Sequence, residues 1–386
     1  MAKPDYDGGG LVNLMASLRA GLGAGACAYP ELALLPGSRL SGARTVVLLL
    51  IDGLGAAYFE RHARSLQGHQ LGSITSVFPS ATAPTITTLL TGTAPQQHAV
   101  TGWHMHLREL GTVAAILPFR ARWGGPPLST AGVAVAPLLG APALTDELPA
   151  AVTYISPANI SDSAFNTALA ASARRVPFAD TTELFSVLQR EIGAPQEKRR
   201  RYIYAYWPGF DAVCHAFGTE SEFALAHFHE LETGIEALIS ALRGSDTQLM
   251  VTADHGFVDL GDGDCVDLGD HPELADCLAL PLCGEPRAAF CHLREGQARR
   301  FERYVAKHLD SHFECIASDA LIEEGWLGRG RPDARLRDRL GDYVLIGRDN
   351  RIIRDALPHQ QPPRHIGVHG GCHSDEMYVP LLLSEC

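Results

Sequence analysis

Apolar runs of strand length recur along the chain with helical patterns between them, and this alternation restricts the fold more than any other feature. The run Arg44–Ile51 is continuous and β-branched at its start, which is typical of a strand buried on both faces. Further strands are expected at Arg201–Tyr206, Gln248–Thr252 and Met377–Leu383, where Pro380 favours a sheet edge or a strand end. The alternation predicts an α/β fold whose mostly parallel central sheet is flanked by helices.

One helix is marked clearly, over Thr219–Arg243. Apolar residues recur in it at three- and four-residue steps, and Thr219 and Glu222 have the spacing of a capping box. Gly244 then predicts its end.

Two regions interrupt the alternation. Residues 107–149 are rich in Pro, Gly and Ala, and residues 261–363 contain their own strand-like and helix-like segments, Ala288–Leu293 and Gln297–Leu309. We expect residues 1–260 to form the first part of a main domain. Residues 261–363 then form an inserted, smaller, cap-like subdomain, and residues 364–386 return to the main domain with its last strand.

Composition excludes several classes of protein. A chain of 386 residues fits one large α/β domain with an insertion, or two domains. Its net charge of −12 argues against bulk nucleic-acid binding, and the basic run Lys198–Arg201 is interpreted as a solvated surface. The longest apolar run, Val46–Ile51, is too short to span a membrane. Nine cysteines without C-x-x-C pairs, and no recognisable secretory signal, predict a cytoplasmic protein. The oligomeric state is left open.

Aspartate and histidine gather where the expected strands end. In open α/β sheets, ligands bind beyond the carboxyl ends of the strands, so these positions are candidate site residues. Such residues follow three of the strands, and one more lies just before the last strand: Asp52, Asp211, His215, Asp254, His255 and His369. Each motif alone is common in turns or on helix surfaces, but the set together indicates a metal site.

The donor types suggest which metal. Carboxylate and imidazole ligands without thiolate suit zinc, and some such sites accept manganese. Six ligands are enough for two metals with three protein ligands each and an open position. That layout is typical of sites that clamp the attacking and leaving oxygens of a phosphoryl group.

A run of hydroxyl residues, Ser80 to Thr88, begins a further helix. Pro84 is tolerated in the first turn, so Thr82 is expected where the helix starts. A metal can activate a hydroxyl nucleophile, and a helix N-terminus favours a phosphate. Thr82 is therefore the candidate nucleophile, whereas Ser80, Thr87 and Thr88 are interpreted as capping and helix-surface residues.

The order of these motifs, from Val46 to Leu383, resembles the alkaline phosphatase superfamily, and within it the type I phosphodiesterase and nucleotide pyrophosphatase family. The resemblance implies that family's fold and a covalent phospho-threonine intermediate at a two-metal site. By the same resemblance, Asp211, His215 and His369 would bind the first metal, Asp52, Asp254 and His255 the second, and Thr82 would bridge both.

The sequence departs from the family pattern three residues after Thr82. Many nucleotide pyrophosphatases have Asn there to contact a phosphoryl oxygen, whereas Thr85 stands here, with a hydroxyl of shorter reach. His373 lies close to His369 and is the alternative metal ligand. His369 is preferred because two glycines follow it.

The expected reaction is metal-dependent hydrolysis of a phosphodiester or pyrophosphate bond in a small phosphate ester, such as a nucleotide. The alternatives are a phosphomonoesterase or phosphonate hydrolase on the same scaffold, or a non-catalytic relative that only binds. Trp103 and Trp207 either stack on a leaving group or pack at a domain edge.

Overall fold

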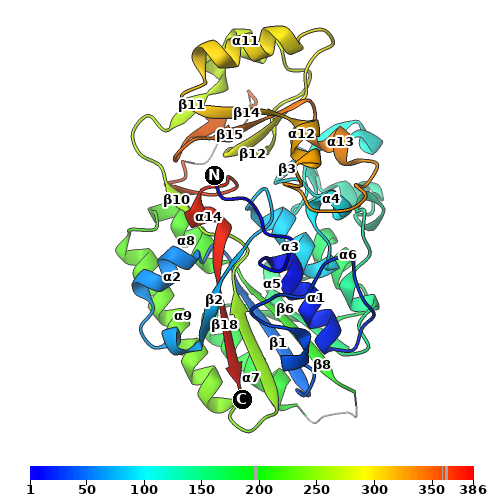
Figure 1. The fold of residues 1–386 in the computed structure, drawn as a ribbon, viewed down its shortest axis with the longest axis vertical. Coiled ribbons are helices and arrows are strands. Elements are labelled where there is room, and N and C mark those ends of the chain that lie inside the picture. The colour runs from blue at the N-terminus through cyan, green and yellow to red at the C-terminus, as the bar shows by residue number, and fades with distance from the viewer. Residues whose placement is uncertain (195–198, 359, 361–363) are drawn as a thin grey trace.

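The computed structural model describes residues 1–194, 199–358, 360 and 364–386, and contains two seven-stranded sheets. The main sheet and its helices form the larger body, and the second sheet lies at one end of it (Figure 1). The strands of the main sheet run in the order β2-β18-β9-β1-β8-β6-β7. They are β1 (Thr45–Ile51), β2 (Gln70–Thr75), β6 (Ala151–Pro157), β7 (Arg174–Phe178), β8 (Arg201–Trp207), β9 (Thr247–Thr252) and β18 (Tyr378–Glu385).

The centre of the main sheet is parallel, as the sequence predicts. Every residue of β1 is buried, and β1 pairs in parallel with β8 on one side and β9 on the other. Strands β6 and β7 continue the parallel order beyond β8. The predicted α/β class with a mostly parallel sheet is confirmed, although the sequence reading had not marked β2, β6 and β7.

Strand β18 differs from its expected place. It is antiparallel to both neighbours and lies inside the sheet, so the edge is β2 and not β18. Pro380 is accommodated because that end of β18 pairs only with β2, opposite Ser73, whereas pairing with β9 begins at Leu382. The missing N–H of Pro380 therefore removes no bond from the β9 ladder.

Helices cover both faces of the main sheet. In Figure 1, α2, α8 and α9 lie on one side, and α1 and α3 lie on the other. The helices of this body are α1 (Leu11–Gly21), α2 (Ala56–His62), α3 (Thr82–Thr91), α4 (Pro95–His98), α5 (Ala158–Ser161), α6 (Ala164–Ala170), α7 (Thr181–Gly193), α8 (Gly209–Phe217), α9 (Glu222–Ala241) and α14 (Ser374–Met377).

Helix α9 begins later than expected, and the predicted capping box is wrong. Ser221 is the N-cap, and its hydroxyl accepts a hydrogen bond from the N–H of Ala224 at 3.1 Å. Thr219 is held elsewhere, because its N–H and hydroxyl donate to the carboxylate of Asp259 at 2.8 and 3.0 Å. Gly244, with φ +77°, follows the helix as predicted.

The second sheet is antiparallel and has the order β14-β15-β13-β12-β3-β4-β5. Its strands are β3 (His104–Leu107), β4 (Thr112–Ala115), β5 (Arg120–Ala121), β12 (Cys283–Glu285), β13 (Ala288–Cys291), β14 (Phe313–Ala317) and β15 (Tyr343–Gly347). Helices α10 (Pro272–Ala275), α11 (Ala298–His308), α12 (Ser318–Glu323) and α13 (Leu336–Leu340) lie in the same part of the chain. Because β3 pairs with β12, residues 104–121 share one sheet with the region predicted as an insertion.

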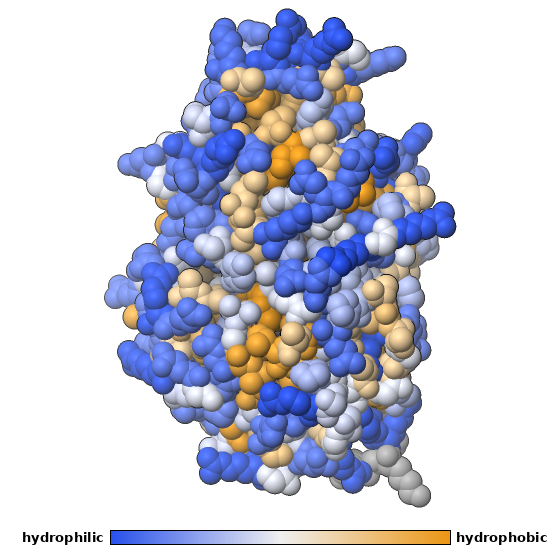
Figure 2. Space-filling model, in the orientation of Figure 1, coloured by the Kyte–Doolittle hydropathy of each residue, from blue (hydrophilic) through white to orange (hydrophobic). Residues whose placement is uncertain are grey.

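Two short strand pairs lie between the larger elements. They are β10 (Val258–Asp259) with β17 (Gly367–Val368), and β11 (Cys265–Asp267) with β16 (Ile352–Arg354). The visible face of the molecule is mostly hydrophilic, with apolar colour over the β2 edge and over the second sheet (Figure 2). No helix in the described ranges is long and apolar enough to cross a membrane.

The basic run forms the expected solvated surface only in part, at Arg199, which is exposed. Lys198 lies outside the described residues, and Arg200 and Arg201 are half-buried. Arg200 donates to the carbonyls of Ala43 and Leu40 at 2.8 and 2.7 Å, and Arg201 donates to the carbonyl of Glu191 at 2.7 Å. These arginines satisfy chain carbonyls around the start of β8.

A buried ion pair joins the two bodies. Arg287 lies between β12 and β13, Glu376 lies in α14, and both side chains are fully buried. The guanidinium donates to both carboxylate oxygens, at 2.9 and 2.6 Å. The same carboxylate accepts from the N–H groups of Gly371 and His373, at 2.9 and 3.1 Å. The pair therefore also holds the loop that follows His369.

Breaking this pair is expected to destabilise the protein strongly. Arg287→Gln leaves the Glu376 carboxylate buried without its cation, a change that costs about 3–5 kcal/mol in comparable cases. The matched control is Arg108→Gln, because Arg108 pairs with Asp338 at an exposed site and should contribute less than about 1 kcal/mol. Urea denaturation of both variants measures the difference, and equal unfolding midpoints would contradict the expectation.

Candidate active site

Two buried aspartates stand at the carboxyl end of the main sheet. Asp52 directly follows β1, and Asp254 follows the neighbouring parallel strand β9. One oxygen of each is held: Tyr206 donates its hydroxyl to Asp52 Oδ2, and the N–H of Gly53 donates to Asp254 Oδ1 at 3.0 Å. The other oxygens, Asp52 Oδ1 and Asp254 Oδ2, are buried without a hydrogen-bond partner. Such orphaned carboxylate oxygens are unusual unless they bind a cation.

His255 brings these oxygens together with Thr82. Its Nδ1 donates to the carbonyl of Gly256 at 3.0 Å, which leaves a lone pair on Nε2. Nε2 lies 3.3 Å from Asp52 Oδ1, 3.5 Å from Asp254 Oδ2 and 3.2 Å from the Thr82 hydroxyl. The ligand atoms of Asp52, Asp254 and His255 all lie within 4.8 Å of one another, a spacing that can hold one metal ion.

A second group adjoins the first. Asp211 and His215 lie one turn apart on α8, and Asp211 Oδ1 is 3.4 Å from His215 Nε2 and 3.6 Å from His369 Nε2. The two Nε2 atoms of His215 and His369 are 3.2 Å apart. His215 Nδ1 donates to the carbonyl of Gly367 at 2.8 Å, so its Nε2 also presents a lone pair. The rings of His255 and His369 stack with centroids 3.6 Å apart, which places the two groups side by side.

Burial disfavours the charged forms of these ligands. It raises the pKa of Asp52 to about 6 and that of Asp254 to about 8, and the neighbouring Asp52 charge adds to the shift of Asp254. Burial also holds the pKa of Asp211 well above its usual range. Burial and the adjacent His365 lower the pKa of His215 to about 3, so this imidazole is neutral at neutral pH. Clustered buried carboxylates with neutral imidazoles are a donor set that fits divalent cations.

Thr82 is the first residue of α3, with Ala81 as the N-cap. The first N–H groups of a helix have no partner within it, so the Thr82 hydroxyl lies at an anion-binding helix end. The other hydroxyl residues of the run were expected to cap the helix or lie on its surface. Instead, Ser80, Thr87 and Thr88 are fully buried. Thr87 bonds the carbonyl of Ala83, and Ser80 bonds that of Gly371.

Thr85 lies away from the reacting groups. Its side chain is fully buried, and its hydroxyl is 3.1 Å from that of Ser76, which also donates to the carbonyl of Asp254. Thr85 does not line the cavity beside Thr82. A substrate contact through Thr85 therefore stays a prediction, and this geometry lends it no support.

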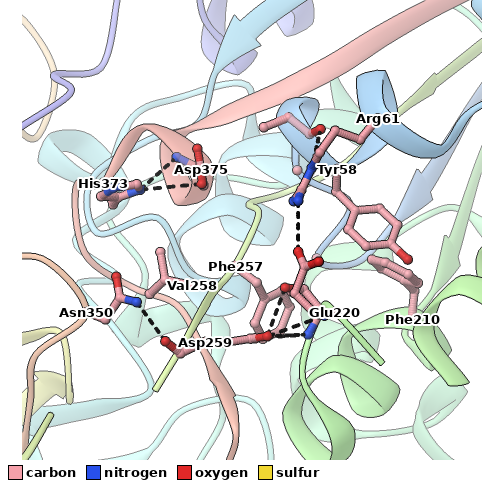
Figure 3. A pocket seen from close by; sticks show the side chains of 14 residues that line it. Tyr58, Arg61, Phe210, Glu220, Phe257, Val258, Asp259, Asn350, His373 and Asp375 are labelled. Atoms are coloured by element: carbon pink, nitrogen blue, oxygen red, sulfur yellow. Dashed lines mark hydrogen bonds and ion pairs between the residues drawn. The ribbon is translucent and has the colours of Figure 1, made fainter. Parts of the chain in front are cut away.

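Of the two late histidines, His369 is the one beside the other candidate ligands. His373 is the N-cap of α14, and its Nδ1 accepts the N–H of Asp375 at 3.2 Å. Figure 3 shows His373 facing a separate pocket, together with Asp375 and Asn350. Phe257 lines that pocket, and its ring packs 5.1 Å from the ring of His369.

The two tryptophans have different places. Trp207 is buried, stacks on Phe178 and donates to His227 at 3.0 Å, so the packing interpretation holds for it. Trp103 is 39% exposed and lines a cavity of about 690 Å³ that also contains Asp52, Thr82 and Asp211. The cavity gives a substrate a route to the Thr82 hydroxyl.

Several residues that support the site had not been singled out from the sequence. Tyr206 orients Asp52, Ser76 bonds the Asp254 carbonyl, and Glu376 holds the loop after His369. The tyrosines at alternate positions 202, 204 and 206 of β8 share one face of the sheet, which was a usable signal for Tyr206. No local pattern marked Glu376, because its partner Arg287 is distant in the sequence.

Comparisons with known proteins identify the family and the fold of the chain. Residues 46–371 match the family model described as type I phosphodiesterase / nucleotide pyrophosphatase. No curated protein matches the sequence. Among solved structures, murine ectonucleotide pyrophosphatase / phosphodiesterase 5 superposes with a TM-score of 0.65 at 15% identity, over 87% of each chain. The human protein of that name gives 0.64 at 14% identity, over 88% of this chain and 87% of its own.

A third similar structure is phosphonoacetate hydrolase from Sinorhizobium meliloti. It has a TM-score of 0.62 at 16% identity, over 89% of this chain and 91% of its own. At these identities the structural likeness shows the fold, whereas the family follows from the sequence match over most of the chain. The chain is a hydrolase that belongs to the type I phosphodiesterase / nucleotide pyrophosphatase family, within the alkaline phosphatase superfamily.

Proposed function

We propose that the protein hydrolyses phosphodiester or pyrophosphate bonds of small phosphate esters through a covalent phospho-threonine on Thr82. One observation carries the proposal. The Thr82 hydroxyl lies at a helix N-terminus, 3.2 Å from His255 Nε2 and beside two adjoining groups of oxygen and nitrogen donors. A nucleophile, an anion-binding helix end and a cation-binding donor set thus meet at one point.

The two donor groups fit two divalent ions. Asp52, Asp254 and His255 would hold one, and Asp211, His215 and His369 the other, with Thr82 between them. The unpartnered oxygens Asp52 Oδ1, Asp211 Oδ1 and Asp254 Oδ2 support this assignment. Carboxylate and imidazole donors favour zinc, and manganese is the alternative. When bound, such ions lower the pKa of a hydroxyl and neutralise charge on the attacking and leaving oxygens.

The chain's own groups perform the rest of the reaction. Thr82 Oγ1 gives its proton to solvent and attacks phosphorus, and the bond to the leaving alcohol or phosphate oxygen breaks, with that oxygen taking up a proton from solvent where it leaves as an alcohol. The N-terminal N–H groups of α3 face the phosphoryl oxygens that gain negative charge. Water then attacks phosphorus, the bond to Thr82 Oγ1 breaks, and the threonine hydroxyl is restored.

Two similar structures support this direction. One is an inactive threonine-to-alanine variant of murine ectonucleotide pyrophosphatase / phosphodiesterase 5 in complex with AMP. A nucleotide is therefore a reasonable substrate class for this chain. Phosphonoacetate hydrolase was solved with phosphonoacetate and with phosphonoformate, which makes a phosphonate the second candidate. The cavity of about 690 Å³ favours a diester, since it is far larger than such small phosphonates need.

Substrate preference tests the reaction class. Metal-free protein with zinc or manganese added back should hydrolyse bis(p-nitrophenyl) phosphate faster than p-nitrophenyl phosphate or phosphonoacetate. The reason is that the cavity has room for a second ester group. Release of p-nitrophenol and of inorganic phosphate measures the rates. A faster reaction with the monoester or the phosphonate would replace the diester assignment, and no reaction with any metal would remove the enzymatic one.

Removing the nucleophile should stop turnover without emptying the site. Thr82→Ala is expected to lower kcat by at least about 10³-fold, because no other hydroxyl can form the covalent intermediate. Bound metal, measured by elemental analysis, should stay nearly unchanged, since six ligands remain. Thr82→Ser keeps the hydroxyl and is the matched control, with partial activity. Full activity of Thr82→Ala would rule out the covalent route.

The buried carboxylates predict how stability depends on pH in metal-free protein. The pKa of Asp254 is about 8 when folded and near 3.8 when unfolded, so the folded state keeps a proton that the unfolded state loses. Stability is therefore lost as pH rises toward about 8. The lowered pKa of His215 changes stability only below the ordinary histidine pKa of 6.5. Glu285, with a pKa raised to about 8, acts in the same direction as Asp254.

The test follows the melting temperature of metal-free protein between about pH 6.5 and about pH 8, a window set by these pKa values. Melting temperature should fall as pH rises, and zinc should reduce the fall because it stabilises the charged carboxylates. Asp254→Asn should also make the fall smaller, leaving the part due to Glu285 and Asp211, whose pKa values are raised as well. An unchanged slope in Asp254→Asn would show that Asp254 is already ionised in the folded protein.

A further inference from the structure

The cavity beside Thr82 has one wall that is not used by the chemistry. Its main-body wall includes Tyr154, Tyr204 and Tyr206, close to the reacting groups. The opposite wall comes from the second sheet and the loops next to it: Trp103, Leu117, Pro118, Arg120, Pro127 and Ser129. A substrate at Thr82 can therefore place its remaining substituent along side chains of the second sheet.

The main chain of Trp103 is anchored in this wall. Its backbone N–H donates to Glu285 Oε1 at 2.6 Å, and its carbonyl accepts the N–H of Ile116 at 3.1 Å. Glu285 is buried and lies against Gly370, the residue after His369. Trp103 is nevertheless 39% exposed and lines the cavity that contains Thr82, so it offers this cavity a large planar side chain. An indole ring suits a planar substituent.

Arg120 stands further along the same wall. It is paired with Ala115 of β4, and Ala115 is paired with His104, the residue after Trp103. Two strand spacings therefore separate the backbone of Arg120 from the start of β3, roughly 10 Å.

The charge of Arg120 is available. Its side chain is exposed, and its Nη1 donates to the carbonyl of Gly125 at 3.1 Å. Within the described ranges it forms no ion pair with a carboxylate. Arg175, the other arginine that lines the cavity, is paired with Asp162 at 3.1 Å. The wall thus offers one guanidinium free to bind an anion.

We propose that Trp103 and Arg120 form a specificity subsite for a planar substituent that carries a second negative charge at its far end. This inference rests on the proposed phosphodiesterase function. The preferred substrates are then phosphodiesters or pyrophosphates in which a flat group next to the scissile phosphate stacks on Trp103. A carboxylate or phosphate at the end of that group pairs with Arg120.

Three p-nitrophenyl phosphodiesters that share one leaving group test the subsite. Their second substituents are methyl, phenyl and 4-carboxyphenyl, so the last two differ only by the distal charge. With zinc-loaded protein, kcat/KM should be roughly tenfold higher for the carboxyphenyl ester than for the phenyl ester. Arg120→Gln should bring that ratio to about one. Trp103→Ala should lower kcat/KM for both aryl esters relative to the methyl ester.

The matched control is Arg108→Gln, since Arg108 is exposed between β3 and β4 of the second sheet, pairs with Asp338 and does not line the cavity. It should keep the wild-type ratio. Equal kcat/KM for all three esters in the wild type, or an unchanged ratio in Arg120→Gln, would overturn the subsite while leaving the diesterase function standing. Hydrolysis of none of the three would overturn the proposed function and the subsite with it.

Discussion

Three carboxylates, each with a buried oxygen and none with a fixed cation, are the constraint on which the rest of the structure depends. Asp52, Asp211 and Asp254 each keep a buried oxygen that makes no hydrogen bond, and in the described ranges only histidines lie within ion-pair distance of them. Keeping such a cluster charged away from water costs free energy unless a cation neutralises it. For the same reason, burial raises the pKa values of all three carboxyl groups. Parallel β1, β8 and β9 bring the three residues to one edge, so the sheet order is itself a condition for metal binding.

The second sheet does more than cover the candidate site, because two buried glutamates, Glu376 and Glu285, connect it to the loop that follows His369. Glu376 pairs with Arg287 of the second sheet and accepts the N–H of Gly371, in the loop after His369. Glu285 of β12 accepts the backbone N–H of Trp103 and lies against Gly370. Both contacts end next to His369. Movement of the second sheet relative to the main body would therefore shift a candidate metal ligand and the cavity wall together. This coupling explains why two fully buried charges are kept between the bodies although apolar packing would be cheaper.

The central fold and the reacting residues could be predicted because their signals are local. A continuous apolar run marks a buried parallel strand, and Asp or His directly after it marks the ligand edge, as at Asp52 and Asp254. Long-range pairing escaped the same reasoning. Pro380 suggested a sheet edge or a strand end, but β2 pairs beside it, so β18 lies inside the sheet. Thr219 looked like a helix cap, but Asp259 holds it. Tyr206 and Glu376 act through partners far away in the sequence, and no spacing rule reveals them.

The hydroxyl run of α3 shows how a polar helix can be buried and still present one hydroxyl to the candidate site. All its residues from Ala83 to Thr91 are buried, and its threonine hydroxyls are satisfied one by one: Thr87 and Thr91 bond carbonyls one turn earlier, Thr88 bonds His98, and Thr85 meets Ser76. Thr82, in the first turn, has no carbonyl one turn earlier within the helix to accept its proton. Its hydroxyl meets only His255 Nε2 among the described residues. The buried hydroxyls of the helix are therefore all hydrogen-bonded, whereas the Thr82 hydroxyl lies beside the donor groups of the candidate site.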